Sequence, residues 1–281
     1  MSDEGGRNPF DHRGKSTGEP RIPVNFSPEQ TGVFAEPGAY EAALTHHVDT
    51  TVGPHSDLFH EALGLDLHLD VLMVPPGPNR QWFTLVTCGM GHYEMKMPPE
   101  EGRHKSRMEL AICLPPDWEP FHTYDTPLSG HNERGMRIME GMRFTDNDPP
   151  VTPYGPGGWI MGALNFTAKV PVRYDTWFDE GHTIPNGDPP EPVIEGSELC
   201  CTMLARPRRI GNPYFHKLKL DDGSIVRIMS LILITRPEMD FKLRKGWEAL
   251  MEKLDEKGID ELLDLGRAGV CRGGLLGFLG F

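Results

Sequence analysis

Hydrophobic and polar residues alternate at two places in the first half of the chain, and the first of these predicts a β-hairpin. Residues 65–74 have leucine, valine and methionine at the odd positions and Asp66, His68 and Asp70 between them, which predicts a half-buried strand. A break rich in proline follows. Residues 81–88 then form a second run of aromatic and β-branched residues, so we expect an antiparallel pair of strands here.

Three further strands are predicted downstream. Residues 107–114 alternate again, which places Met108, Leu110, Ile112 and Leu114 on an inward face and Glu109 on the outward face. Residues 197–205 and 223–234 are also strand-like. The second of these is apolar on both faces, which is typical of a strand in the centre of a sheet.

The most regular helical pattern covers residues 238–258, which end in a glycine stop. Its apolar stripe consists of Trp247, Leu250, Met251 and Leu254. A short helix is expected at residues 56–64, capped by Ser56 or Asp57 and ended by Gly64. Further helices are expected at residues 132–142, 158–168 and 259–266.

Together these elements predict an α+β fold, in which a mainly antiparallel or mixed β-sheet is packed against helices. The domain covers residues 39–272. Residues 1–38 are charged and rich in glycine and proline, which predicts a flexible arm. Residues 273–281 form an apolar, glycine-rich tail that is too short to span a membrane. Because no segment has the pattern of a signal peptide, we expect a cytoplasmic protein.

The net charge of the chain favours some classes of binding partner over others. The 281 residues include 41 acidic and 28 basic side chains, a net charge of −13. This excess disfavours binding to the phosphates of nucleic acids and permits a basic protein as partner. The pattern leaves the oligomeric state open.

The five cysteines show neither a CxxC motif nor the spacing of a zinc site, so we expect no disulfides and no structural zinc. Cys88 ends a predicted strand and is interpreted as a packing residue. Cys200 and Cys201 are neighbours in another strand and should point to opposite faces.

Patterns for catalysis are weak. No GxSxG motif is present, and the glycines of residues 155–162 have the wrong spacing for a phosphate-binding loop. We therefore predict no catalytic residue, no cofactor and no metal. The alternative is a metal-assisted hydrolase that uses the His and Asp residues between positions 46 and 70, among them His46, His47, His55, His60 and His68, although none of them has an HExxH spacing.

Several ordered motifs resemble the suppressor of fused domain family. They are "TLVTCGMGHYEMKMP", "RMELAICLPPDW", "GHTIPNGDPPEP", "CCTMLARP", "IMSLILI", "RPEMDFKLRKGWEALMEKL" and "DLGRAGV". The resemblance runs from about Val48 to Val270. Gly91 is a departure, because the family often has Ser there.

The resemblance implies a suppressor-of-fused-like fold and a binding protein rather than an enzyme. Animal members sequester zinc-finger transcription factors, whereas bacterial single-domain members are similar to immunity proteins that neutralise toxins, often nucleases. The length of this chain leaves no room for the extra carboxy-terminal domain of the animal proteins. The resemblance therefore favours the immunity-protein type.

We predict that a partner protein binds at the loop of residues 174–188, through Trp177, Asp179, Glu180 and His182. Aromatic rings beside carboxylates would provide desolvated anchors and electrostatic steering for a basic partner. The alternative surface is the methionine-rich loop of residues 89–97. Trp118 and Trp247 are expected to be buried anchors of the fold.

Overall fold

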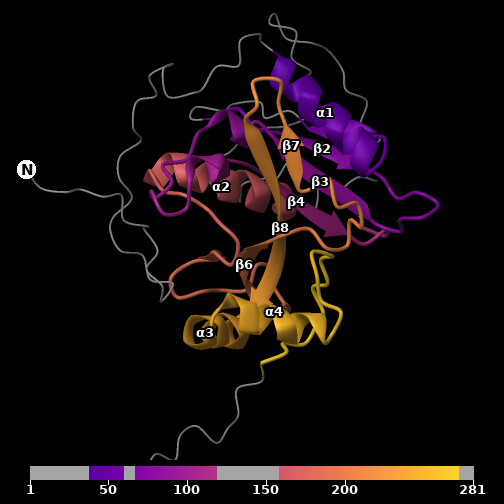
Figure 1. Cartoon of the computed structure of the whole chain (residues 1–281). Coiled ribbons are helices and arrows are strands. Elements are labelled where there is room, and N and C mark those ends of the chain that lie inside the picture. Colours follow the sequence, from indigo (N-terminus) through magenta and orange to yellow (C-terminus); the bar gives the residue numbers. More distant parts are fainter. Residues whose placement is uncertain (1–37, 60–66, 119–157, 272–281) are drawn as a thin grey trace, which may run out of the picture. The chain divides into compact units, whose positions relative to one another are not determined.

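The structure is a computed structural model that describes residues 38–59, 67–118 and 158–271 (Figure 1). Its helices are α1 (Ala39–Thr51), α2 (Trp159–Tyr174), α3 (Arg236–Lys245) and α4 (Trp247–Asp255), with one-turn 3-10 helices η1 (Met90–His92) and η2 (Arg103–Lys105). Its strands are β1 (Asp57–Phe59), β2 (Asp70–Val74), β3 (Phe83–Cys88), β4 (Arg107–Leu114), β5 (Thr183–Pro185), β6 (Leu199–Ala205), β7 (Lys217–Lys219) and β8 (Ile225–Thr235).

Among the described residues, the strands form one mixed sheet in the order β1-β2-β3-β4-β8-β6-β5, with β7 paired to β8 outside this path. Only the β4–β8 pair is parallel in this part of the chain; the other pairs are antiparallel. The chain thus has the predicted α+β class with a mixed sheet. The predicted hairpin is confirmed, since β2 and β3 pair from Asp70↔Cys88 to Val74↔Thr84.

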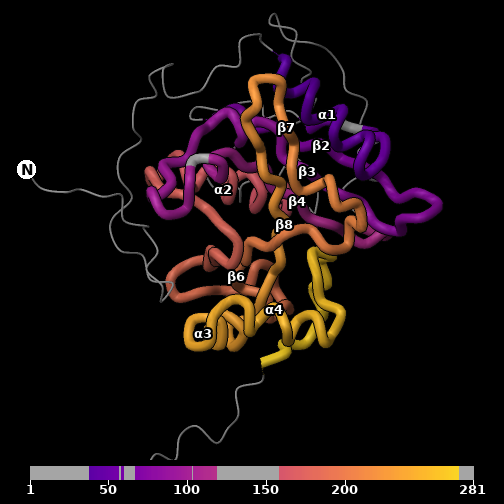
Figure 2. The backbone as a smooth tube through the Cα atoms, in the orientation of Figure 1, coloured from indigo at the N-terminus to yellow at the C-terminus, as the bar shows by residue number. Residues whose placement is uncertain are grey.

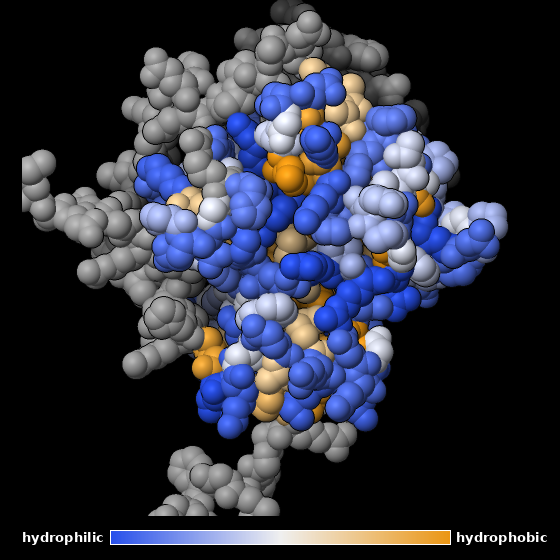
Figure 3. All heavy atoms as spheres, in the orientation of Figure 1, coloured by the Kyte–Doolittle hydropathy of each residue, from blue (hydrophilic) through white to orange (hydrophobic). Residues whose placement is uncertain are grey.

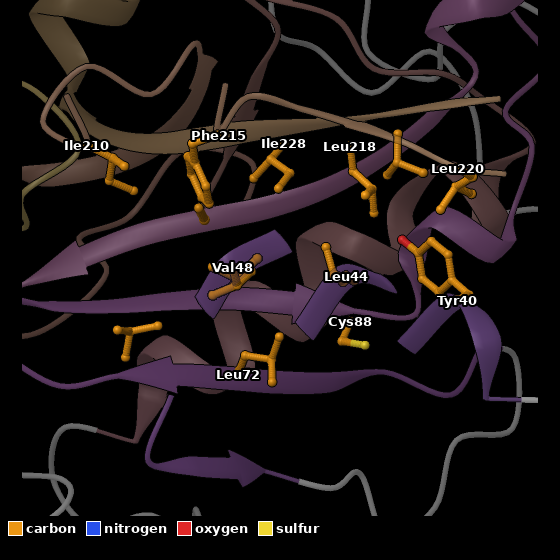
Figure 4. Packing of buried hydrophobic residues seen from close by; sticks show 14 of the residues in the cluster. Tyr40, Leu44, Val48, Leu72, Cys88, Ile210, Phe215, Leu218, Leu220 and Ile228 are labelled. Carbon is orange, nitrogen blue, oxygen red and sulfur yellow. The ribbon is translucent and has the colours of Figure 1, made fainter. Parts of the chain in front are cut away.

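Strand β8 occupies the centre of the sheet, as its apolar sequence predicts (Figure 1). Ten of its eleven residues are buried. Val226 and Ile228 join a hydrophobic cluster with α1, whose Tyr40, Leu44 and Val48 are 1%, 0% and 0% exposed (Figure 4). Ile232 and Ile234 join a second cluster with β6, α3 and α4. Because alternate residues of a strand share a face, these helices cover the same face of β8 near its two ends.

Two predictions about strand faces are wrong. All five residues of β2 are buried, so this strand is not half-exposed. Glu109 of β4 was expected on the outward face, yet it is 0% exposed. Its carboxylate accepts hydrogen bonds from Tyr40 Oη at 2.5 Å and Thr87 Oγ1 at 2.5 Å, and from two backbone N–H groups. These donors make burial of the carboxylate tolerable.

The close approach of Tyr40 explains the departure at Gly91. The two backbone donors to Glu109 belong to Gly89 and Gly91, at 2.9 and 2.8 Å. A Cβ atom on Gly91 would run into the Tyr40 hydroxyl. Position 91 therefore admits only glycine while Tyr40 keeps its place.

The helices differ from the sequence prediction in four ways. Helix α1 was not predicted. Asp57–Phe59 form β1 rather than the start of a helix, because they pair with β2. The single helix predicted for residues 238–258 is two helices separated at Gly246, whose φ of 93° is left-handed. Residues 259–266 form no helix, and Leu262 instead makes a bridge with Cys113.

Helix α2 begins as expected but continues to Tyr174, with Pro171 inside it. The helix predicted at residues 132–142, the arm before Gly38 and the tail at residues 273–281 lie outside the described residues. Within the described part, no helix has the length and apolar character required to cross a membrane.

All five cysteines are free thiols. Cys88 is 4% exposed, and burial raises the pKa of its thiol, as suits a packing residue. Cys200 and Cys201 pack in the same hydrophobic cluster, so the prediction of opposite faces is wrong. The reason is a bulge: Leu199 pairs with Thr235 but Cys201 pairs with Ile234, which leaves Cys200 as the extra residue.

The chain divides into two compact units, one of residues 1–116 with 165–281 and one of residues 117–164. In the smaller unit, Trp118 is 9% exposed and meets Trp159 edge-on, with ring centroids 6.2 Å apart. Trp118 is buried, as expected of an anchor residue. The candidate functional site lies wholly in the larger unit.

Candidate functional site

A pocket of about 380 Å³ lies where two strands diverge along β8. Strand β7 pairs with residues 225–227 of β8 and β6 pairs with residues 230–235, both on the edge opposite to β4. The chain leaves the sheet at Arg206 and returns at His216, and both residues line the pocket. Figure 2 traces this excursion between the label of β6 and that of β7. We call it the divergence pocket.

The predicted partner-binding residues all line the divergence pocket, namely Trp177, Asp179, Glu180 and His182. They lie between the end of α2 and the start of β5. The backbone fixes this segment to β6, since Gly181 N donates to Leu204 O at 2.7 Å and Leu204 N donates to His182 O at 2.9 Å. Phe178, by contrast, is 3% exposed and belongs to the core.

Asp179 forms the centre of an ion-pair network. Its two oxygens accept from Arg227 at 2.5 Å and from Lys105 at 2.7 Å. Burial alone would raise the pKa of this carboxyl, but the hydrogen bond from Lys105 and the charge of Arg227 lower it to about 2. Arg227 also donates to the carbonyls of Lys105 and Phe178. Asp179 therefore holds two cations in place and is not a free steering charge.

The other two carboxylates of the lining are also paired. Glu180 contacts Arg206, with Nε and Oε2 3.0 Å apart. Glu101 contacts Lys105, with Nζ and Oε2 2.6 Å apart. The divergence pocket is therefore not the acidic surface that residues 174–188 suggest in sequence, since each of its carboxylates is neutralised by a neighbouring cation.

His182 lies beside Trp177, with ring centroids 4.6 Å apart. Burial and the nearby charge of Lys242 lower the pKa of His182 to about 4. Burial likewise lowers the pKa of His216. Both rings are accordingly neutral near pH 7, where they offer aromatic surface and hydrogen bonding rather than charge.

Trp247 also lines the pocket. It was expected to centre the buried stripe of a long helix, but it starts α4 and is only partly buried. Its indole lies against Gly181, where a Cβ would clash with the ring. The φ of Gly181 is +80°, so this position requires glycine for two reasons.

Sequence reasoning missed the cations and the apolar floor of the pocket. Lys105, Arg206, Lys217, Arg227 and Met229 all line it but are far from residues 174–188 in sequence. One pattern could have indicated Arg227, because it is a charged residue inside the apolar run of β8. A charge in such a run needs a partner, and here the partner is Asp179.

The described residues of the two alternative sites, the methionine-rich loop and the His and Asp residues between positions 46 and 70, do not form a binding surface or a metal site. Met90 and Met95 of the methionine-rich loop are each 2% exposed and belong to the core. His55 pairs with Asp49 at 2.7 Å and His68 pairs with Asp70 at 3.0 Å, as two separate pairs. In residues 38–59, 67–118 and 158–271, no three His, Cys, Asp or Glu side chains converge as a metal site. His60 and Asp66 lie outside these ranges.

Solved structures share this fold. A SUFU homologue from Neisseria gonorrhoeae FA 1090 is 20% identical, with a TM-score of 0.54, 84% of this chain covered and 98% of that chain. The Sufu–Fu complex structure matches at 14% identity and a TM-score of 0.51, covering 83% and 92%. Drosophila Suppressor of Fused is 13% identical, with a TM-score of 0.53. The match covers 83% of this chain and 51% of that chain.

A search of curated proteins found no match to the chain. A comparison of the sequence with family models did find one. Residues 66–268, well over half of it, match the family model described as Suppressor of fused protein (SUFU), a domain that serves as a protein-interaction module. The chain belongs to the suppressor of fused protein family.

Proposed function

We propose that this chain is a non-enzymatic binding protein that holds another protein at the divergence pocket. The observation that supports this most directly is the convergence of Trp177, His182 and Trp247 on one pocket. Half-buried aromatic side chains with fixed surroundings are typical anchors of protein interfaces, because they bury much area at little entropic cost. Membership of a family of protein-interaction modules supports the same function.

We further propose that the partner is a basic toxin of the nuclease type and that the chain is its immunity protein. A nuclease must approach phosphates, so its surface is basic, and a net charge of −13 would accelerate its encounter with this chain. Hydrophilic residues cover most of the face in Figure 3 and surround smaller apolar patches. Because Asp179 and Glu180 are neutralised locally, we assign the steering to the charge of the whole chain.

The test has two stages. Tagged wild-type chain is used to capture partners from the cells that produce it, in parallel with Trp177→Ala and the control Tyr214→Ala. Tyr214 is an aromatic residue that is 76% exposed and does not line the divergence pocket. We expect recovery of the partner to fall at least about tenfold with Trp177→Ala and to be unchanged with Tyr214→Ala. Equal recovery with all three baits would place the site elsewhere.

The second stage tests the partner's chemistry. The captured protein is expressed alone and together with this chain. We expect a basic protein that arrests growth by degrading nucleic acid, and we expect co-expression with the wild type, but not with Trp177→Ala, to restore growth. A partner that is harmless on its own would refute the immunity role and leave the binding role standing.

A further inference from the structure

The divergence pocket offers more hydrogen-bond donors than acceptors. Four cationic side chains line it: Lys105, Arg206, Lys217 and Arg227. They face three carboxylates, each already in an ion pair with one or more of these cations. The question is therefore which donors remain for a ligand.

Lys217 is the first such donor. Within the described residues its ammonium group has no hydrogen bond and no ion pair, and the side chain is exposed at the start of β7. Arg206 is the second. It uses Nε for Glu180, and its side chain is 68% exposed, which leaves its two terminal nitrogens available.

Arg227, which also lines the pocket, is a third cation with a donor that the described residues leave unused. The residue is 9% exposed, and its Nε is buried without a hydrogen-bond partner in the part of the chain that the structure describes. Buried donors without a partner are uncommon and costly. The carboxylates, by contrast, already receive donors, at both oxygens of Asp179 and at the Oε2 atoms of Glu101 and Glu180.

The remaining lining consists of three histidines, two tryptophans and Met229. Met229 is 3% exposed, and Trp177 and Trp247 are half-buried. A group that fits must thus combine acceptor oxygens with an apolar neighbour. A carboxylate fits a lysine and an arginine well, because both then form charge-assisted hydrogen bonds.

We infer that the divergence pocket binds an Asp or Glu side chain of the partner protein, with an adjacent apolar residue of the partner against Trp177 and Trp247. This inference rests on the proposed function and specifies its chemistry. A partner can be basic overall, and so be attracted at long range, while it inserts one acidic side chain at short range. A polyphosphate backbone fits less well, since the −13 net charge opposes a chain of phosphates.

The experiment uses defined peptides and the full chain. Three blocked peptides, Ac-Gly-Phe-Glu-Gly-NH2 and its Gln and Lys versions, are titrated while the indole N–H resonances of Trp177 and Trp247 are followed by NMR. Lys217→Glu is compared with Lys219→Glu. The two lysines are exposed on the same side of β7, around buried Leu218, but only Lys217 lines the pocket. The two variants therefore change net charge equally.

We expect the Glu peptide to bind at least about tenfold more tightly than the Gln peptide, and the Lys peptide to bind most weakly. Lys217→Glu should abolish the preference for Glu, whereas Lys219→Glu should retain it within about twofold. Arg206→Gln, at an exposed side chain, provides a second variant should Lys217→Glu not fold.

Equal binding of the Glu and Gln peptides would overturn the inference, as would a preference that survives Lys217→Glu and Arg206→Gln, or no binding of any peptide up to about 10 mM. Tighter binding of a short oligothymidylate than of the Glu peptide would assign the pocket to phosphate instead. These outcomes can be distinguished from those of the capture experiment. Capture that does not depend on Trp177, together with a clear preference for the Glu peptide, would reject the pocket as the partner's site but leave it as a carboxylate site. Capture that depends on Trp177, without a preference for the Glu peptide, would reject the carboxylate and leave the partner at the pocket.

Discussion

The carboxylate of Glu238 accepts hydrogen bonds from both terminal nitrogens of Arg267, at 2.8 and 2.7 Å. Glu238 is 0% exposed. The same carboxylate accepts from the backbone N–H groups of Thr235, at the start of α3, and Val270. Arg267 also donates to Leu233 O at 2.7 Å. One buried ion pair thus joins the end of β8, the start of α3 and the last described segment of the chain.

Removal of Arg267 should be severely destabilising. Arg267→Ala leaves a buried carboxylate without its cation, and we expect the free energy of unfolding to fall by about 3–5 kcal/mol in urea denaturation. The control is Arg236→Ala, which breaks a half-exposed pair with Asp240 and should cost less than about 1 kcal/mol. Similar losses in both variants would contradict the structural role of the buried pair.

The same pair predicts a pH dependence. Burial would raise the pKa of Glu238, but the hydrogen bonds and charge of Arg267 outweigh it and lower the pKa below its ordinary value of 4.5. A lowered carboxyl pKa means that the unfolded state binds the proton more tightly. The contribution of Glu238 is therefore complete above about pH 4.5 and is lost as the pH falls through its folded pKa. Arg267→Ala should flatten this part of the stability curve.

Tyr40→Phe tests the buried cage of Glu109. The change removes only the hydroxyl that donates to Glu109 at 2.5 Å and leaves the carboxylate with one donor fewer. We expect a loss of about 1–3 kcal/mol in the free energy of unfolding. Tyr214→Phe removes the same atom at a 76% exposed site and should be neutral within about 0.5 kcal/mol. Equal effects would show that Tyr40 contributes no special hydrogen bond.

Gly181→Ala tests the wall formed by Trp247. The φ of +80° penalises alanine, and the new Cβ would meet the indole ring. Gly196→Ala is matched, because its φ is +85° and no atom lies within 4 Å of the new Cβ. We expect Gly196→Ala to lower the free energy of unfolding by about 1–2 kcal/mol through backbone strain alone. Gly181→Ala should lower it by at least about 1 kcal/mol more, because the new Cβ also overpacks the site. Thermal unfolding of both variants gives the difference.

Deletion of residues 1–37 should leave the melting temperature within a few degrees of wild type, because their sequence lacks apolar periodicity. Deletion of residues 1–52 should abolish cooperative unfolding, since it removes Tyr40, Leu44 and Val48 from the core. Calorimetry on the two truncated chains distinguishes these outcomes. A large loss already at residue 37 would mean that the arm docks on the domain.

The sequence by itself determined the central strand and four of the thirteen residues that line the pocket. The apolar run of β8 requires burial on both faces, and that requirement holds in any fold. The strand at Arg107–Leu114 follows from its alternation and has the predicted bounds. Trp177, Asp179, Glu180 and His182 could be selected together because they are neighbours in the chain.

Only the tertiary structure decided what surrounds these residues. Glu109 is buried because donors from α1, β3 and η1 meet at one point, and alternation in β4 cannot reveal them. Asp179 is neutralised by Lys105, 74 residues away, and by Arg227, 48 residues away. The divergence pocket arises from where β6 and β7 pair along β8. Contacts of this range depend on strand order and register, which local hydrophobic patterns do not encode.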